Sequence, residues 1–307
     1  MSLTERVKAT MKSEDTEGAF ELYVTRTPGY LWALFFKALH IHPIVVTLIS
    51  IVIGTSCGYF FYFDDLKMNL IGMLMLIWAN WYDCADGQLA RMTNQRTAIG
   101  RFLDGLGGEL WFLSIYVSLA LRMDDIYGWW IWPLLLFTGF YCHARQAALA
   151  DYYRNIHLWF LFAGKGNGNE LDRSSQTQER YDLLHWKQGE WMEKAYLLFY
   201  MLYTRGQEIA TPWFQRFYEQ LQTTYGKNIP DNLRHRFRIK SRPLMKYCNI
   251  LTFDSRVGVF FLSILTGWLL MFPMFEIFIL EPLRYYVKHR HEGFCHEFYN
   301  ELTNHEA

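Results

Sequence analysis

The sequence lacks the cysteine patterns of a disulfide framework or of a zinc site. Its five cysteines are scattered over 307 residues, are odd in number and include no Cys-x-x-Cys pair. It also lacks a charge surplus, because 30 basic residues balance 30 acidic ones, whereas nucleic-acid binders carry a concentrated basic excess. The first twenty residues are charged, so we expect no N-terminal signal peptide. These features argue against a disulfide-rich secreted domain and against nucleic acid as a partner.

The sequence does contain apolar segments long enough to cross a membrane, and polar segments separate them. Hydrophobic residues make up 51% of the chain, yet 20% of its residues are charged. The clearest segment runs without a charge from Pro43 to Phe63, and at about 1.5 Å per residue it is long enough for one crossing. Further spans are predicted at 68–82, 104–121, 127–144, 257–272 and 274–287. We predict an all-α, polytopic membrane bundle of about six transmembrane helices.

The last two predicted spans have an alternative interpretation. Pro273 is expected at a tight turn between them, but Glu276 and Glu281 interrupt the second apolar run. One long helix over 257–280 would give five crossings instead of six. Basic residues gather at the N-terminus, in the 91–101 link, in the 145–255 region and in the tail, and the positive-inside rule assigns these segments to the cytoplasm. Six spans satisfy that assignment and place both termini in the cytoplasm.

Two segments outside the spans are predicted to lie at the membrane surface. Thr27-Pro28-Gly29 should break the chain before Tyr30–Leu39, which is too short to span a bilayer. We predict an interfacial helix there, the alternative being an amphipathic helix packed on the domain. In the polar region after the fourth span we expect a flexible loop at 164–170 and an in-plane helix at 191–203. A further helix is expected to begin at Thr211-Pro212. The basic run at 234–246 is expected either to be solvated or to attract anionic headgroups. A stripe of four aromatic residues and one leucine in this region is expected to pack in a core or interface: Trp213, Phe214, Phe217, Tyr218 and Leu221.

Three carboxylates at the ends of predicted spans indicate a candidate functional site. Asp83 and Asp86 are three residues apart on a helix, so their Cβ atoms share one face at about 5–6 Å. Asp104 precedes the next apolar run, and a charge in such a place is costly and usually functional. A divalent cation would offset their repulsion, and oxygen-only ligands suit Mg²⁺ or Mn²⁺, which commonly bind substrate phosphates as well. Gly87 and Ala90 leave room for a ligand such as phosphate.

The spacing of seven residues resembles the signature of the CDP-alcohol phosphotransferases, also called CDP-alcohol phosphatidyltransferases. These residues are Asp83, Asp86, Gly87, Ala90, Arg91, Gly100 and Asp104. His42-Pro43 is similar to the short polar entry to that family's first membrane helix. The resemblance implies metal ligation by Asp83, Asp86 and Asp104, with a two-ion Mg²⁺ or Mn²⁺ site expected. It also implies donor and nucleotide binding near Gly87, Ala90, Arg91 and Gly100, although Arg91 is also open to interpretation as an exposed helix-end arginine.

The sequence departs from the family pattern at one position. The family has a fourth aspartate four residues after the position of Asp104, where it serves as a metal ligand and as the base for the acceptor alcohol. Here that position is Gly108, and the next residue is Glu109. A shift of one residue rotates the attachment point by about 100° around the helix, which the longer glutamate side chain and the Gly107-Gly108 pair could partly offset. Glu109 is therefore our candidate catalytic base, the alternative being a helix-end charge.

The resemblance implies that a CDP-linked lipid donor, such as CDP-diacylglycerol, gives its phosphatidyl group to a polar alcohol and releases CMP, in phospholipid biosynthesis. Arg145 and Arg256 are candidates for binding an acidic acceptor such as inositol phosphate or glycerol phosphate, whereas His143 is interpreted as a helix-end histidine. The expected partners are the donor, the acceptor and membrane lipid, with a homodimer as a candidate assembly. Two alternatives stay open: an enzyme that uses a soluble CDP-alcohol and a lipid acceptor, and a non-catalytic lipid-binding or scaffolding subunit.

These features divide the chain into five predicted parts. They are a cytoplasmic or interfacial N-terminal segment (1–42), a transmembrane catalytic core with the Asp motif (43–155), a cytoplasmic or interfacial helical insertion (156–255), a C-terminal transmembrane hairpin (256–289) and a cytoplasmic tail (290–307). The active site is expected toward the cytoplasm.

Overall fold

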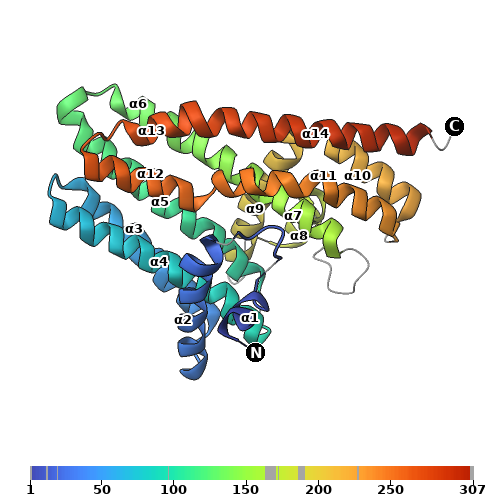
Figure 1. The fold of residues 1–307 in the computed structure, drawn as a ribbon, viewed down its shortest axis with the longest axis horizontal. Coiled ribbons are helices and arrows are strands. Elements are labelled where there is room, and N and C mark those ends of the chain that lie inside the picture. The colour runs from blue at the N-terminus through green and yellow to red at the C-terminus, as the bar shows by residue number, and fades with distance from the viewer. Residues whose placement is uncertain are drawn as a thin grey trace. The chain divides into compact units, whose positions relative to one another are not determined.

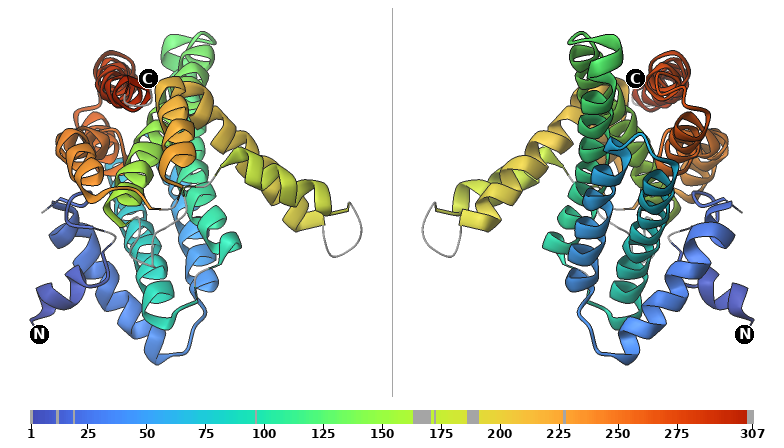
Figure 2. Two further views of the ribbon diagram at one scale, coloured as in Figure 1. Left: turned by 90° about the vertical axis from the view of Figure 1, so that its right-hand side faces the viewer. Right: turned by 90° about the vertical axis from the view of Figure 1, so that its left-hand side faces the viewer.

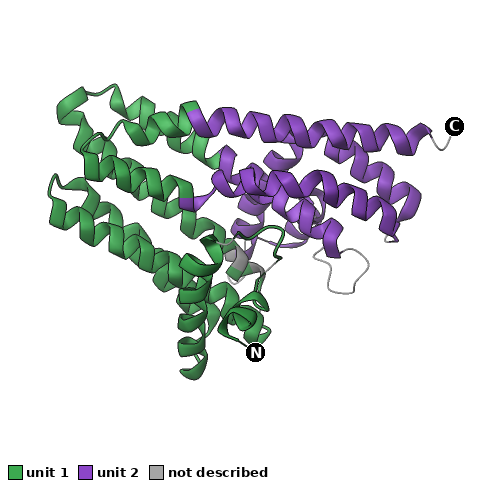
Figure 3. Cartoon of the chain, viewed as in Figure 1, with its two compact units in different colours: residues 1–144, 255–278 green, residues 145–254, 279–307 purple. Residues whose placement is uncertain are grey.

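The computed structural model describes all residues except 1, 12, 19, 96, 163–170, 172, 186–190, 227 and 305–307, so the loop expected at 164–170 lies outside the described residues. Every element in the described part is helical (Figure 1), which confirms the predicted all-α class. The chain forms two compact units (Figure 3): the first comprises residues 1–144 and 255–278, and the second comprises residues 145–254 and 279–307.

The first unit starts with short helices: α1 (Leu3–Lys8), the π-helix η1 (Glu21–Arg26) and α2 (Thr27–Ala38). The break expected at Thr27-Pro28-Gly29 is wrong, because η1 runs directly into α2. Pro28 stands in the first turn of α2, the part of a helix that best tolerates a residue without an N–H. The face of α2 that carries Trp32 and Phe36 packs against Tyr82 of α4 (Leu66–Thr93), with ring centroids 5.0 and 5.2 Å apart, while Phe35 is exposed. The helix thus packs on the domain through one apolar face.

The helix α3 (Pro43–Tyr62) packs along both α4 and α5 (Ala98–Tyr127), as Figure 2 shows in blue to green. It begins where His42 caps it, the Nδ1 atom accepting a hydrogen bond from the Ile44 amide at 3.2 Å. Two glycines set its distance from α5. A Cβ on Gly54 would lie 2.3 Å from the Trp111 ring, and one on Gly58 would lie 2.8 Å from the Ser114 carbonyl oxygen. This spacing of small residues is common where membrane helices meet.

Three stretches of the described chain are long and apolar enough to cross a membrane: Pro43–Tyr62, Phe102–Tyr127 and Asp231–Thr266. The first two coincide with the first and third predicted spans, which are confirmed as apolar helices of membrane length. The third includes α12 (Phe253–Thr266), which holds most of the predicted fifth span. The spans proposed at 68–82, 127–144 and 274–287 lie on helices outside these three stretches and stay predictions.

The rest of the first unit consists of α6 (Ile131–Leu136), the π-helix η2 (Phe137–His143), α12, α13 (Met271–Phe275) and the first residues of the π-helix η3 (Glu276–Leu280). The chain reverses at Gly267, whose φ of +72° lies in the left-handed region that glycine adopts most easily. The turn expected at Pro273 is therefore wrong, and so is the single helix over 257–280. Pro273 instead lies near the start of α13, where a missing N–H costs little.

The second unit contains α7 (Ala144–Phe162), α8 (Ser174–Leu183), α9 (Trp191–Ala210), α10 (Pro212–Tyr225), α11 (Asp231–Ile250) and α14 (Glu281–Asn304). The helix start expected at Thr211-Pro212 is confirmed, and α9 covers the helix expected at 191–203. Aromatic rings form the core: Phe160 and Phe237 stack 3.7 Å apart, and Phe217 packs against Phe298 at 5.5 Å. The α10 stripe contributes Phe214, Phe217 and Leu221 to the buried side chains, which confirms its packing role. In the basic run on α11, Arg236 pairs with Glu301, and Lys240 pairs with Glu297.

Candidate metal and donor site

The structure brings the three predicted acids together. Asp83 and Asp86 lie one turn apart on α4, and Asp104 lies in the second turn of α5. One carboxylate oxygen from each falls within 4.8 Å of the others. Asp86 is buried, Asp83 is half-buried and Asp104 is exposed, so the cluster opens toward the surface of the first unit on one side.

A short connection brings α5 back beside the end of α4. Asn94 ends α4 in the left-handed conformation, with φ of +55°, a conformation that asparagine tolerates better than most residues. Thr97 then caps α5, its hydroxyl oxygen accepting a hydrogen bond from the Gly100 amide at 3.0 Å. This connection has a local sequence cause, because both Asn and Thr are typical residues for the helix ends that they occupy.

The donor set fits a hard divalent cation. All three groups offer carboxylate oxygens, which Mg²⁺ and Mn²⁺ prefer. The Oδ2 atom of Asp86 is buried and has no hydrogen-bond partner among the described residues. A buried carboxylate oxygen without a partner is costly, and a bound cation would satisfy it. The arrangement can therefore hold the ion that the motif predicts.

The glycine and arginine of the motif lie beside this cluster. A Cβ on Gly87 would be 3.5 Å from the Nη1 atom of Arg91, so the guanidinium lies over the bare backbone of the residue that directly follows Asp86. Ala90 is half-buried on the same helix. Glycine is favoured at position 100 for a different, local reason. A Cβ there would lie 3.0 Å from the Thr97 hydroxyl oxygen that caps α5. Donor binding by these residues stays a prediction.

Glu109 lies outside the three-acid cluster of the described residues. It is exposed on α5 and lines a cavity of about 210 Å³ whose wall is mainly apolar and includes Tyr116 and His143. Gly108 faces open space, since nothing lies within 4 Å of the position that a Cβ would take. No described side chain thus occupies the space that the family's fourth aspartate would take. The role of Glu109 as the base stays a prediction.

A buried polar group lies next to the same cavity. Glu276 is fully buried and pairs with Arg256, whose Nε lies 3.2 Å from the Glu276 carboxylate. The Nδ1 atom of His143 lies 3.5 Å from Glu276 and 3.5 Å from the Tyr116 hydroxyl. Arg256 is thus held inside the first unit, whereas Arg145 is exposed on α7 in the second unit. His143 sits among these side chains rather than at a helix end, because η2 continues into α7.

Sequence reasoning missed Arg26, which the N-terminal segment places beside the motif helix. Its carbonyl accepts a hydrogen bond from the buried Gln88 side chain at 3.0 Å, and its Nε lies 3.0 Å from Glu17. Burial alone would lower the pKa of the guanidinium, but the nearby Cys84 thiol and the acidic groups Glu17, Glu21 and Asp83 raise it above its usual range. Arg26 therefore keeps its positive charge next to the acidic cluster. No local pattern marks it, because only the packing of the N-terminal segment on α4 brings it there.

Comparison with known proteins agrees with the motif. The model of the CDP-alcohol phosphatidyltransferase family matches residues 40–159, so this part of the chain is a CDP-alcohol phosphatidyltransferase domain. The chain is also 27% identical over 142 residues to an uncharacterized protein of Aquifex aeolicus (strain VF5), a match that covers 42% of this chain and 70% of the relative. No solved structure matches the chain significantly. The family resemblance is confirmed, and it supports a general transferase role in a membrane.

Proposed function

We propose that the protein is an integral membrane transferase that moves the phosphatidyl group of a CDP-linked lipid donor, such as CDP-diacylglycerol, to a polar alcohol and releases CMP. The observation that carries this proposal is the meeting of the Asp83, Asp86 and Asp104 carboxylates within 4.8 Å, inside a CDP-alcohol phosphatidyltransferase domain. The three acids come from two different helices and would otherwise repel one another. Their convergence is best explained by a cation that also binds the donor pyrophosphate.

The chain's own residues would bind and orient the donor. Asp83, Asp86 and Asp104 would hold Mg²⁺ or Mn²⁺, with two ions expected. When bound, the metal would neutralise the pyrophosphate oxygens and stabilise the leaving CMP. Arg91, whose guanidinium lies over the bare backbone of Gly87, would pair with a donor phosphate on this side of α4.

The acceptor hydroxyl needs a group that takes its proton, and Glu109 would supply it. Glu109 is the first carboxylate after Asp104 on α5, and its exposed side chain lines the apolar cavity. General base catalysis requires the carboxylate within hydrogen-bond reach of the hydroxyl, directly or through one water. The acceptor itself would be an acidic alcohol, such as inositol phosphate or glycerol phosphate. Of the two candidate binding residues, Arg256 is buried in its pair with Glu276, so the exposed Arg145 stays the candidate.

The apolar cavity would receive part of the lipid substrate. Its wall follows α5 from Leu106 to Ala120, beginning two residues after Asp104. At about 1.5 Å per residue this wall is about 20 Å long, which suits an acyl chain in extended form. Such a chain would lie along α5 while its headgroup stays at the acidic cluster.

The direct test supplies purified protein in detergent with CDP-diacylglycerol labelled in the lipid and with a panel of polar alcohols. The proposal predicts that one alcohol yields a labelled phospholipid together with an equal amount of CMP. Labelled lipid acceptors with soluble CDP-alcohols form the second arm, and turnover only there would identify the enzyme that uses a soluble donor. The absence of turnover in both arms, with the protein folded and Mg²⁺ bound, would favour the non-catalytic subunit that the glycine at position 108 makes conceivable.

A further inference from the structure

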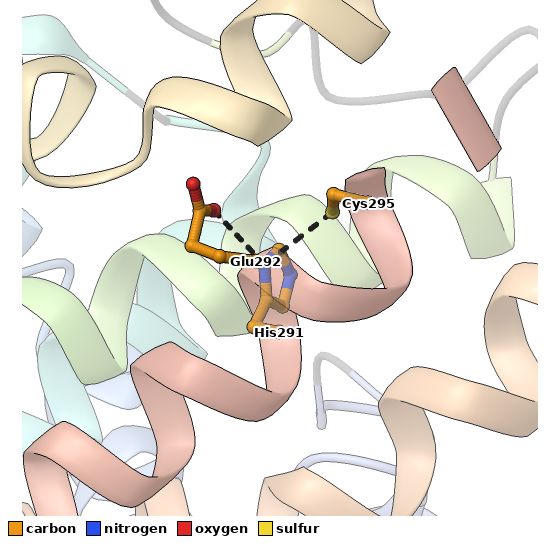
Figure 4. Close-up of side chains that lie close together, drawn as sticks. All are labelled: His291, Glu292 and Cys295. Atoms are coloured by element: carbon orange, nitrogen blue, oxygen red, sulfur yellow. Dashed lines mark hydrogen bonds and ion pairs between the residues drawn. The ribbon is translucent and has the colours of Figure 1, made fainter. Parts of the chain in front are cut away.

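A second group of potential metal ligands lies in the second unit, apart from the aspartate motif in the sequence. His291, Glu292 and Cys295 all belong to α14, and one potential ligand atom from each lies within 4.8 Å of the others. Figure 4 shows the imidazole between the carboxylate and the thiol. The Nδ1 atom of His291 lies 3.7 Å from the Glu292 carboxylate and 3.6 Å from the Cys295 sulfur.

The spacing of these atoms suits a tetrahedral ion. Zinc binds nitrogen and oxygen at about 2.0–2.2 Å and sulfur at about 2.3 Å, so two ligands of one tetrahedral ion lie about 3.4–3.6 Å apart. The two distances from the His291 Nδ1 atom are 3.6 and 3.7 Å, close to these values. A hydrogen bond between the same groups would bring nitrogen and carboxylate oxygen to about 2.9 Å. Both distances from the His291 Nδ1 atom are thus close to those between ligands of one ion, and the Glu292 and Cys295 atoms lie within 4.8 Å of each other.

The polar atoms of the group are buried and incompletely satisfied. His291 and Cys295 are fully buried, and Glu292 is 7% exposed. The Oε1 atom of Glu292, which faces the imidazole, has no hydrogen-bond partner among the described residues. Its other oxygen accepts a hydrogen bond from the Trp213 amide at 2.7 Å, which holds the carboxylate in place. A buried carboxylate oxygen without a hydrogen-bond donor is costly, and a bound cation would satisfy it.

We propose that His291, Glu292 and Cys295 form a zinc-binding site in the second unit. The combination of imidazole, thiolate and carboxylate favours Zn²⁺ over Mg²⁺, which binds almost only oxygen. These three ligands leave a fourth position for water. The Tyr153 ring stacks on His291 at 3.9 Å, and its hydroxyl is buried without a hydrogen-bond partner among the described residues.

The bound ion would stabilise the packing of α14 in the second unit. Its ligands contact α7 through Tyr153 and the start of α10 through the Trp213 amide. An ion that binds the folded state alone shifts the folding equilibrium toward that state. We therefore expect zinc to raise the unfolding temperature of the protein, independently of any transferase activity.

The test measures metal in the purified protein and uses Co²⁺ as a spectroscopic substitute for Zn²⁺. The proposal predicts about one zinc per chain and, with Co²⁺, the near-ultraviolet charge-transfer absorption of a cobalt–thiolate bond. Cys295→Ser should lose the thiolate absorption, and His291→Ala should lose most of the bound zinc. His289→Ala, an exposed histidine on the same helix, should keep both.

The aspartate motif provides the main control because it also binds divalent ions under the proposed function and contains Cys84. Cys84→Ser should retain the cobalt–thiolate absorption, whereas binding by oxygen ligands alone gives none. Loss of the absorption in Cys84→Ser instead of Cys295→Ser would assign the thiolate to the motif and overturn the proposal. So would unmodified protein that takes up no zinc and gives no thiolate absorption with Co²⁺, a result that requires no variant to fold. Failure of the zinc site would leave the transferase proposal untouched, because CMP release is measured separately.

Discussion

At the scale of single residues, the most informative position is Glu109, because glycine occupies the place of the family's fourth aspartate. If Glu109 is the base, Glu109→Gln should lower turnover by about 10²–10⁴-fold, the usual loss when a general base is removed, while the affinity for the CDP-linked donor stays nearly unchanged. Steady-state kinetics and donor binding measured on the same preparation check both parts. Glu179→Gln makes the same chemical change at an exposed site on α8 and should behave like the parent.

A second variant separates the base from a general charge effect. Gly108→Asp, made in the Glu109→Gln background, restores the family spacing, and the structure has space for it because nothing lies within 4 Å of a Cβ there. We expect activity to return. Full activity of Glu109→Gln would instead mean that Glu109 is only a helix-end charge.

The sequence alone identifies a functional residue when its partners lie nearby in the chain, and not when only tertiary packing brings them together. The sequence alone identifies the three acids of the motif, because Asp83, Asp86 and Asp104 lie close together in the chain, on two consecutive helices. The proposed zinc ligands His291, Glu292 and Cys295 also lie within five residues of the sequence. They contain only one cysteine, so a search for Cys-x-x-Cys pairs does not find them. Arg26 could not be found, since it reaches the motif helix only through packing between segments about sixty residues apart.

At the scale of helices, the close approach of α3 and α5 depends on Gly58. A Cβ there would lie 2.8 Å from the backbone oxygen of Ser114, which cannot rotate away as a side chain can. Gly58→Ala should therefore destabilise the protein by about 1–3 kcal/mol, as overpacking typically does. Thermal unfolding in detergent measures the effect.

The matched control is Gly258→Ala on α12, where a Cβ meets nothing within 4 Å. Alanine is favoured over glycine inside a helix by about 0.5–1 kcal/mol, so this variant should be neutral or slightly stabilised. Equal effects of the two substitutions would show that α3 and α5 do not require the small residue.

Helix positions were predictable where an apolar pattern coincides with a local start signal. The uncharged run after His42 becomes α3, and Thr211-Pro212 starts α10, because each combines an apolar pattern with a local start signal. Prolines misled at the other boundaries, since Pro28 and Pro273 both lie near helix starts, where the missing N–H is tolerated. The turn in the structure is at Gly267, whose backbone is in the left-handed conformation. A single glycine in the sequence is only a weak signal for such a turn.

At the scale of the whole molecule, the number of membrane crossings fixes the side on which the chain ends. Six spans and the positive-inside rule predict that both termini face the cytoplasm. A reporter enzyme fused after the last residue should therefore be active on the cytoplasmic side, and a second reporter inserted after the end of α5, at Gly128, should face the opposite side. An external C-terminal reporter would require an odd number of spans and would remove one of the two C-terminal crossings.

The central claim is that the three-aspartate cluster binds the metal through which a CDP-linked donor is used, and metal-dependent CMP release from CDP-diacylglycerol tests it most directly. With the acceptor alcohol identified, the account predicts that EDTA stops CMP release and that added Mg²⁺ or Mn²⁺ restores it. Asp86→Asn, which changes the buried ligand, should be inactive with either metal, whereas Asp125→Asn at the exposed end of α5 should match the parent. CMP release that persists in EDTA, or in Asp86→Asn at the parental rate, would contradict the account.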